Sequence, residues 1–90
     1  MSKPNSIRYV IYQEGEFHIA QGLELDICVQ GCSAEEAHQR FAVALRAEIS
    51  EATSNGEDIF ATIGPAPSFI HAMFDNERVC RGHQKLPEAA

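Results

Sequence analysis

Apolar and polar side chains alternate over the N-terminal part of the chain in a pattern that predicts three β-strands. Residues 7–13 are rich in β-branched and aromatic side chains, which favour the extended backbone of a strand. Residues 14–16 read Glu-Gly-Glu, and Gly15 can take the left-handed conformation that a tight turn requires. Residues 17–21 return as a second strand, and residues 25–30 alternate as a third. We therefore expect an antiparallel hairpin followed by a third strand.

The spacing of apolar residues changes after the third strand and predicts a helix over residues 34–53. The apolar stripe of this helix consists of Ala37, Phe41, Ala44, Leu45, Ile49 and Ala52. Ser33 and Glu36 have the spacing of a capping box, in which each side chain bonds to the backbone near the other. Arg40 stands four residues after Glu36 on the exposed side, and Gly56 is typical of a helix end. The strand residues expected beneath the stripe are Tyr9, Ile11, Phe17 or Ile19, and Ile27 or Val29.

The C-terminal third of the chain has a weaker pattern. Residues 58–63 fit either a fourth strand or an extended loop. Residues 64–67 contain two prolines, which continue neither a strand ladder nor a helix. Ser68 is positioned to cap a short second helix over residues 69–76. The polar residues 78–90 predict a flexible tail.

These elements predict one α+β domain over residues 7–77, between a disordered start at residues 1–6 and the flexible polar tail. The order β-β-β-α, with a possible further strand and a short C-terminal helix, predicts a small antiparallel sheet with one helix packed on a face. A chain of 90 residues buries only one small core. We therefore expect it to gain stability as a homodimer or a larger assembly.

Charge narrows the classes of function. The chain has 7 Lys and Arg against 13 Asp and Glu, a net charge of −6 at pH 7. An acidic protein repels phosphate backbones and attracts basic partners, which excludes a generic basic nucleic-acid binder. No apolar run approaches the roughly 20 residues of a membrane span, and residues 1–6 lack the apolar core of a secretory signal. These features predict a cytoplasmic protein with no membrane contact.

The cysteines and histidines are candidates for two kinds of chemistry, metal binding and nucleophilic catalysis. Cys28, Cys32, Cys80 and His83 are enough for a structural zinc site, but the spacing of the first two is irregular for one, and Cys28 lies within a predicted strand. An odd number of cysteines does not suit a disulfide framework. Neither the cysteines nor the histidines accompany a nucleophile elbow or a glycine-rich oxyanion loop. We therefore expect no metal, no cofactor and no enzymatic activity.

Residues 22–37 combine an acidic-apolar pair, a Gln-Gly pair and a helix start with two glutamates. The residues that carry this motif are Glu24-Leu25, Gln30-Gly31, Ser33 and Glu35-Glu36-Ala37. Together with the hairpin turn at residues 14–16, the motif resembles the HicB-like antitoxin family over residues 7–53. Leu23 departs from the family pattern, in which a proline is usual at this place.

The resemblance implies a partial ribonuclease-H-like fold without catalysis. It implies a bacterial antitoxin that masks a small basic ribonuclease toxin and that forms dimers or larger assemblies. Residues 57–90 match neither the ribbon-helix-helix nor the helix-turn-helix module of the DNA-binding members, so DNA binding is not expected. Two alternatives are an orphan oligomeric domain that binds a small ligand between helix and sheet, and a minor hydrolase that uses a cysteine or histidine.

Four acidic residues are candidates for the partner-binding surface. Glu14 and Glu16 flank the hairpin turn, and Glu35 and Glu36 open the helix. We expect the turn and the helix start to lie at one end of the domain. Their charges would then attract a basic partner.

Overall fold

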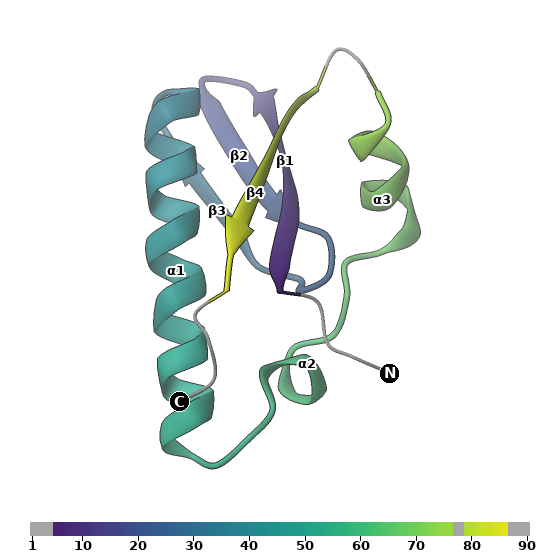
Figure 1. Cartoon of the computed structure of the whole chain (residues 1–90). Helices are drawn as coiled ribbons and strands as arrows, with labels where there is room; N and C mark the ends of the chain where they lie inside the picture. Colours follow the sequence, from purple (N-terminus) through teal and green to yellow (C-terminus); the bar gives the residue numbers. More distant parts are fainter. Residues whose placement is uncertain (1–4, 77–78, 87–90) are drawn as a thin grey trace.

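The architecture was examined in a computed structural model, which describes residues 5–76 and 79–86. The strands are β1 (Ser6–Glu14), β2 (Phe17–Gly22), β3 (Cys28–Gly31) and β4 (Cys80–Lys85). The helices are α1 (Ala34–Ser54), α2 (Ile59–Thr62) and α3 (Ser68–Phe74). The strands form one antiparallel sheet in the order β3-β2-β1-β4, and α1 runs along one side of it (Figure 1). The α+β class and the hairpin that were expected are thus present.

The central strand β1 pairs with β2 on one side and with β4 on the other. The hairpin turn between β1 and β2 places Gly15 at φ 61°, the left-handed region that favours glycine. The third strand is shorter than expected, because residues 25–27 form the approach to β3 and the strand begins only at Cys28.

The fourth strand lies in the segment that was predicted to be a flexible tail, and over residues 80–85 that prediction is wrong. β4 shows little apolar alternation, so its sequence gives no strand signal; pairing with β1 holds it in place. Gly82 stands opposite Tyr9, and a Cβ at this glycine would lie 2.5 Å from Cζ of the tyrosine ring. The lack of a side chain at Gly82 therefore lets the tyrosine pack across β4. Residues 78 and 87–90 of the predicted tail lie outside the described residues.

The predictions for the segments on either side of the prolines also need correction. Residues 58–63 form neither a strand nor an extended loop, because the Asp58 carboxylate accepts a hydrogen bond from Phe60 N at 3.1 Å and starts the single turn of α2. The second helix is present as α3, but its N-cap is Pro67 and Ser68 makes no capping hydrogen bond. At the N-terminus, Ser6 belongs to β1 and residues 1–4 lie outside the described residues.

The main core lies between α1 and the sheet. Phe41 is fully buried and stacks on Tyr9 with ring centroids 4.3 Å apart. Tyr9, Ile11 and Ile27 were expected in this core and belong to it. The expectation of Phe17 or Ile19 there is wrong. Ile19 pairs with Tyr12 on the other face of the sheet, and Phe17 is 44% exposed; Ala20 is the β2 residue that α1 covers.

A second, smaller core covers the opposite face of β1. Its buried residues are Val10, Leu23, Ala66 and Ile70, with Tyr12, Met73, Phe74 and Val79 packed against them. The side chains of β1 that point away from the main core are thus covered by α3 and nearby loops. This explains why both faces of residues 7–13 are apolar.

Candidate interaction surfaces

The two pairs of candidate glutamates lie at the same end of the domain. His18 at the start of β2 pairs with Gly31 at the end of β3, and α1 begins three residues later. The hairpin turn and the helix start are therefore neighbours, as Figure 1 also shows. Glu14, Glu16 and Glu35 are exposed there. We call this surface, formed by Glu14, Glu16, Glu35 and Glu36, the acidic end.

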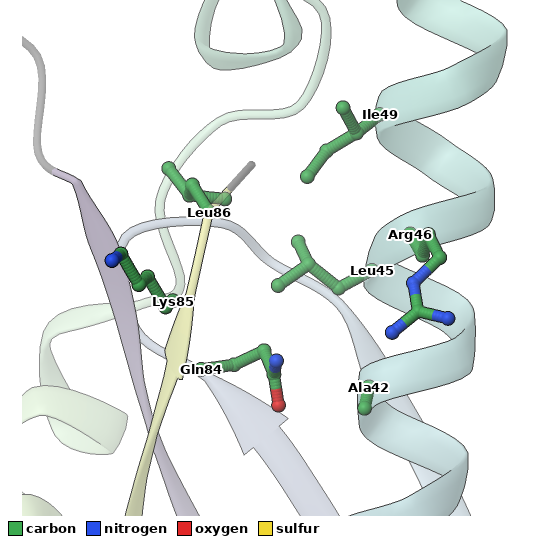
Figure 2. Close-up of a pocket in the computed structure, with 7 residues that line it drawn as sticks. All are labelled: Ala42, Leu45, Arg46, Ile49, Gln84, Lys85 and Leu86. Carbon is green, nitrogen blue, oxygen red and sulfur yellow. The ribbon is translucent and has the colours of Figure 1, made fainter. Parts of the chain in front are cut away.

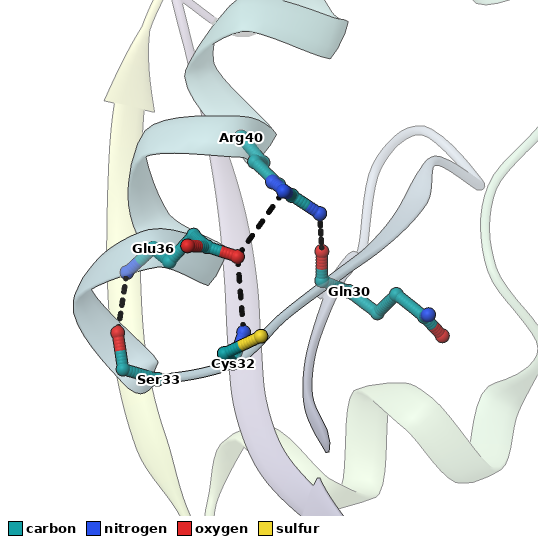
Figure 3. Close-up of polar contacts among 5 residues, drawn as sticks. All are labelled: Gln30, Cys32, Ser33, Glu36 and Arg40. Atoms are coloured by element: carbon teal, nitrogen blue, oxygen red, sulfur yellow. Dashed lines mark hydrogen bonds and ion pairs between the residues drawn. The ribbon is translucent and has the colours of Figure 1, made fainter.

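Glu36 differs from the other three glutamates because it closes the cap of α1 (Figure 3). The Ser33 hydroxyl accepts a hydrogen bond from Glu36 N at 3.1 Å, and a carboxylate oxygen of Glu36 accepts one from Cys32 N at 3.0 Å. The expected capping box is thus present, with Glu36 reaching one residue further back than Ser33. Arg40 forms an ion pair with Glu36 at 3.2 Å and donates to the Gln30 carbonyl at 3.0 Å.

The glycine of the Gln-Gly pair has a packing role at the same place. A Cβ at Gly31 would lie 2.8 Å from Ala37 N and 3.1 Å from the Glu36 carbonyl carbon, so the end of β3 touches the first turn of α1 directly. Two carboxylates in that first turn also interact favourably with the positive end of the helix dipole. Glu35 and Glu36 of the acidic end are therefore held at a closely packed strand-to-helix junction.

A second charged surface follows β4. Arg81, His83 and Lys85 pair with Val10, Arg8 and Ser6, so they lie on the sheet face opposite α1. Both Arg8 and Arg81 approach the Phe74 ring, with guanidinium carbons 5.2 and 5.6 Å from its centroid. Glu24 neutralises Arg8 through an ion pair of 2.6 Å. We call Arg81, His83 and Lys85 the basic row; it was missed because its residues were assigned to a tail.

A groove of about 430 Å³ separates β4 from α1 (Figure 2). It is lined by Ala42, Leu45, Arg46, Ile49, Gln84, Lys85 and Leu86. Leu45 and Ile49 extend from α1 toward β4, and Gln84 points back toward the helix. The lining contains two cationic side chains and no carboxylate, although the chain as a whole has a net charge of −6.

A smaller hollow of about 140 Å³ lies where α1 ends and the chain turns into α2. Glu48, Glu51 and Glu57 contribute to its lining. The last turn of α1 contains no basic residue, so these carboxylates meet the negative end of the helix dipole without compensation. They form a second acidic region, separate from the acidic end.

The cysteines and histidines do not converge as the candidate chemistry requires. Cys28 lies on β3, whereas Cys80 and His83 lie on β4, and β2 and β1 stand between them. Three strand spacings separate these edges by about 14 Å, too far for one zinc ion. In the parts of the chain that the structure describes, no group of three or more His, Cys, Asp or Glu residues could hold a metal ion.

Two of the four histidines have defined partners. The Tyr9 hydroxyl and Nδ1 of His38 are joined by a hydrogen bond of 2.6 Å beneath α1. Burial raises the pKa of the Tyr9 phenol above its ordinary value, and the nearby Cys80 thiol adds to the effect. His83 packs edge-on against Phe74, with ring centroids 5.9 Å apart. Each of these two histidines thus contacts an aromatic side chain of the fold.

Cys28 is exposed, but its sulfur lies in an unfavourable environment for a thiolate. Partial desolvation raises the pKa of the Cys28 thiol, and Asp26 and Glu14 raise it further. A raised pKa leaves less of the reactive thiolate at neutral pH.

Within residues 5–76 and 79–86, no helix has the length and apolar character that a membrane crossing requires. Comparison of the chain with protein-family models, with curated proteins and with solved structures finds no match.

Proposed function

We propose that the chain is a non-catalytic, HicB-like protein-interaction domain that acts as an antitoxin by masking a small basic toxin. The observation that carries this proposal is the acidic end, where Glu14, Glu16 and Glu35 are exposed on a hairpin and a helix start that are neighbours in space. A basic protein surface is the partner that such a surface attracts most strongly.

The order of elements supports the same proposal. The hairpin, third strand and long helix occupy residues 6–54, the region in which the sequence resembles the family. The Gln-Gly pair and the capping box of that resemblance both have physical roles at the junction of β3 and α1. Gly31, Ser33 and Glu36, which are among the residues that carry the resemblance, therefore shape the acidic end.

The test is capture of partners from the cells in which the chain is found. The tagged full chain is purified at low salt, and the co-purified species are identified by intact mass. We expect a small basic protein in near-equal amount, which is released as the salt concentration rises because screening weakens exposed charge pairs. Recovery of the chain alone, or only with copies of itself, would contradict the antitoxin proposal.

The second candidate function is that of an orphan oligomeric domain that binds a small ligand. The groove between α1 and β4 is the observation that favours it, because its walls are the helix and the sheet, as that hypothesis requires. It predicts a ligand-dependent rise in melting temperature in a metabolite screen. However, one wall is the edge of a strand, which favours an extended chain over a compact small molecule.

A further inference from the structure

The strand β4 ends the sheet and leaves one edge unpaired. In the order β3-β2-β1-β4, β4 has β1 on one side and no described strand on the other. Its outer edge therefore offers backbone N–H and C=O groups to another strand. All six residues of Cys80–Lys85 are paired with β1, so the edge is extended and ready to receive a partner.

An apolar surface runs alongside this free edge. A strand added there would direct every second side chain toward α1 and into the groove. Leu45, Ile49 and Leu86 line the groove at this point. The incoming strand would thus need apolar side chains at alternate positions.

The charges beside the edge indicate which side chains suit the remaining positions of the incoming strand. Arg81 and Lys85 point to the face of the sheet opposite α1, with His83 between them on the same face. Carboxylates at the intervening positions of an added strand would point to this same face and lie beside Arg81 and Lys85. Cross-strand pairs of opposite charge are favourable and pairs of like charge are not.

The same charges disfavour a second copy of this chain as the occupant. Antiparallel pairing of two β4 strands about a two-fold axis keeps each face of the sheet continuous. The basic row of one copy, Arg81, His83 and Lys85, would then stand beside the basic row of the other in any register that pairs most of the strand. Charged residues on an edge strand protect it in this way against self-pairing.

We propose that the free edge of β4 and the groove beside it bind an extended segment of another protein, in which apolar and acidic side chains alternate. The segment adds to the sheet as a fifth strand, with its apolar side chains against α1 and its carboxylates beside Arg81 and Lys85 of the basic row. This surface differs in place and in charge from the acidic end, so the inference does not rest on the antitoxin proposal.

The test uses a blocked synthetic peptide of alternating valine and glutamate, as long as the six residues of β4. It is titrated into the ¹⁵N-labelled full chain. We expect the largest shifts of amide signals in β4 and around Leu45 and Ile49. Three control peptides are used: one with lysine in place of glutamate, one methylated on the amide nitrogens of the valines, and one methylated on the amide nitrogens of the glutamates. Methylation removes the hydrogen-bond donors from one edge of the peptide. Because one edge of the peptide pairs with β4, at least one of the two methylated peptides must lose binding.

A charge-reversal variant distinguishes binding at this site from nonspecific electrostatic attraction. The double variant Arg81→Glu/Lys85→Glu changes two exposed side chains of the basic row without removing a core residue. We expect it to bind the glutamate peptide at least about tenfold more weakly and to bind the lysine peptide better than the wild type does, because both cross-strand charge pairs reverse sign.

Four results would overturn the proposal. These are equal binding of the glutamate and lysine peptides to the wild type, undiminished binding of both methylated peptides, shifts centred away from β4, and no binding at all. Sedimentation of the chain alone provides a further check. A dimer that the double variant strengthens or abolishes would show that a second copy occupies the edge, and would also overturn it.

Discussion

At the residue scale, one side chain connects the sheet, the helix and the edge strand. Tyr9 stacks on Phe41 of α1, bonds to His38 through its hydroxyl and covers the position left open by Gly82 of β4. The apolar pattern of residues 7–13 indicated that Tyr9 would face the helix. The role of Gly82 could not be predicted, because it depends on β4 pairing with β1, which nothing in the local sequence indicates.

The hydroxyl of Tyr9 provides the first prediction at this scale. The substitution Tyr9→Phe keeps the ring stacked on Phe41 and removes only the hydrogen bond to His38. We expect the free energy of unfolding in urea to fall by about 0.5–1.5 kcal/mol, the usual contribution of one hydrogen bond. The matched control is Tyr12→Phe on the other face of β1, which should change stability less. Equal losses in the two variants would show that the bond to His38 contributes nothing.

Two tyrosines and one cysteine also make stability depend on pH. Burial raises the pKa of both Tyr9 and Tyr12 above 10.0, and it raises the pKa of the Cys28 thiol above 9.0. In the unfolded chain these groups ionise at their ordinary pKa, so rising pH stabilises the unfolded state first. We expect the urea midpoint to be level near neutral pH and to decrease from about pH 9 upward. A midpoint that stays constant to about pH 11 would contradict these shifts.

At the element scale, the elements predicted correctly are those whose signals are local. The hairpin has its glycine turn, and α1 has its apolar stripe and its capping box, so both could be predicted closely. Residues 58–63 were misjudged because a single aspartate cap decides their conformation. The strand β4 was missed because only contact with β1 stabilises it, and the basic row and the groove were missed with it.

The junction of β3 and α1 gives the prediction at this scale. In Gly31→Ala, the new methyl group would press on the backbone of Ala37 and Glu36, which the first turn of α1 cannot easily move. We expect a loss of about 1–3 kcal/mol in the free energy of unfolding, typical of overpacking. The control is Gly64→Ala, because a Cβ at Gly64 meets nothing within 4 Å and its φ is not positive. If Gly64→Ala were as destabilising as Gly31→Ala, close packing at this junction would not be the cause.

At the scale of the whole molecule, charge is divided between separate surfaces. The acidic end lies at the junction of the hairpin and α1, and the basic row follows the free edge of β4. A further acidic region, Glu48, Glu51 and Glu57, lies near the end of α1. The net charge of −6 therefore conceals surfaces that attract partners of opposite sign. The two interactions proposed above would therefore use separate surfaces.

The central claim is that the acidic end recognises a basic partner, and one comparison tests it most directly. Three tagged chains are used to capture partners from the same cells at low salt. They are the wild type, the triple variant Glu14→Lys/Glu16→Lys/Glu35→Lys, and the control Glu48→Lys/Glu51→Lys/Glu57→Lys. Both triple variants change the net charge equally, and both leave the capping residue Glu36 in place.

We predict that the wild type and the control capture the same small basic protein and that the acidic-end variant does not. The reason is that only the acidic-end variant reverses the charges that face the partner. Equal capture by the two triple variants would show that net charge alone, and not the acidic end, determines binding, and would contradict the account.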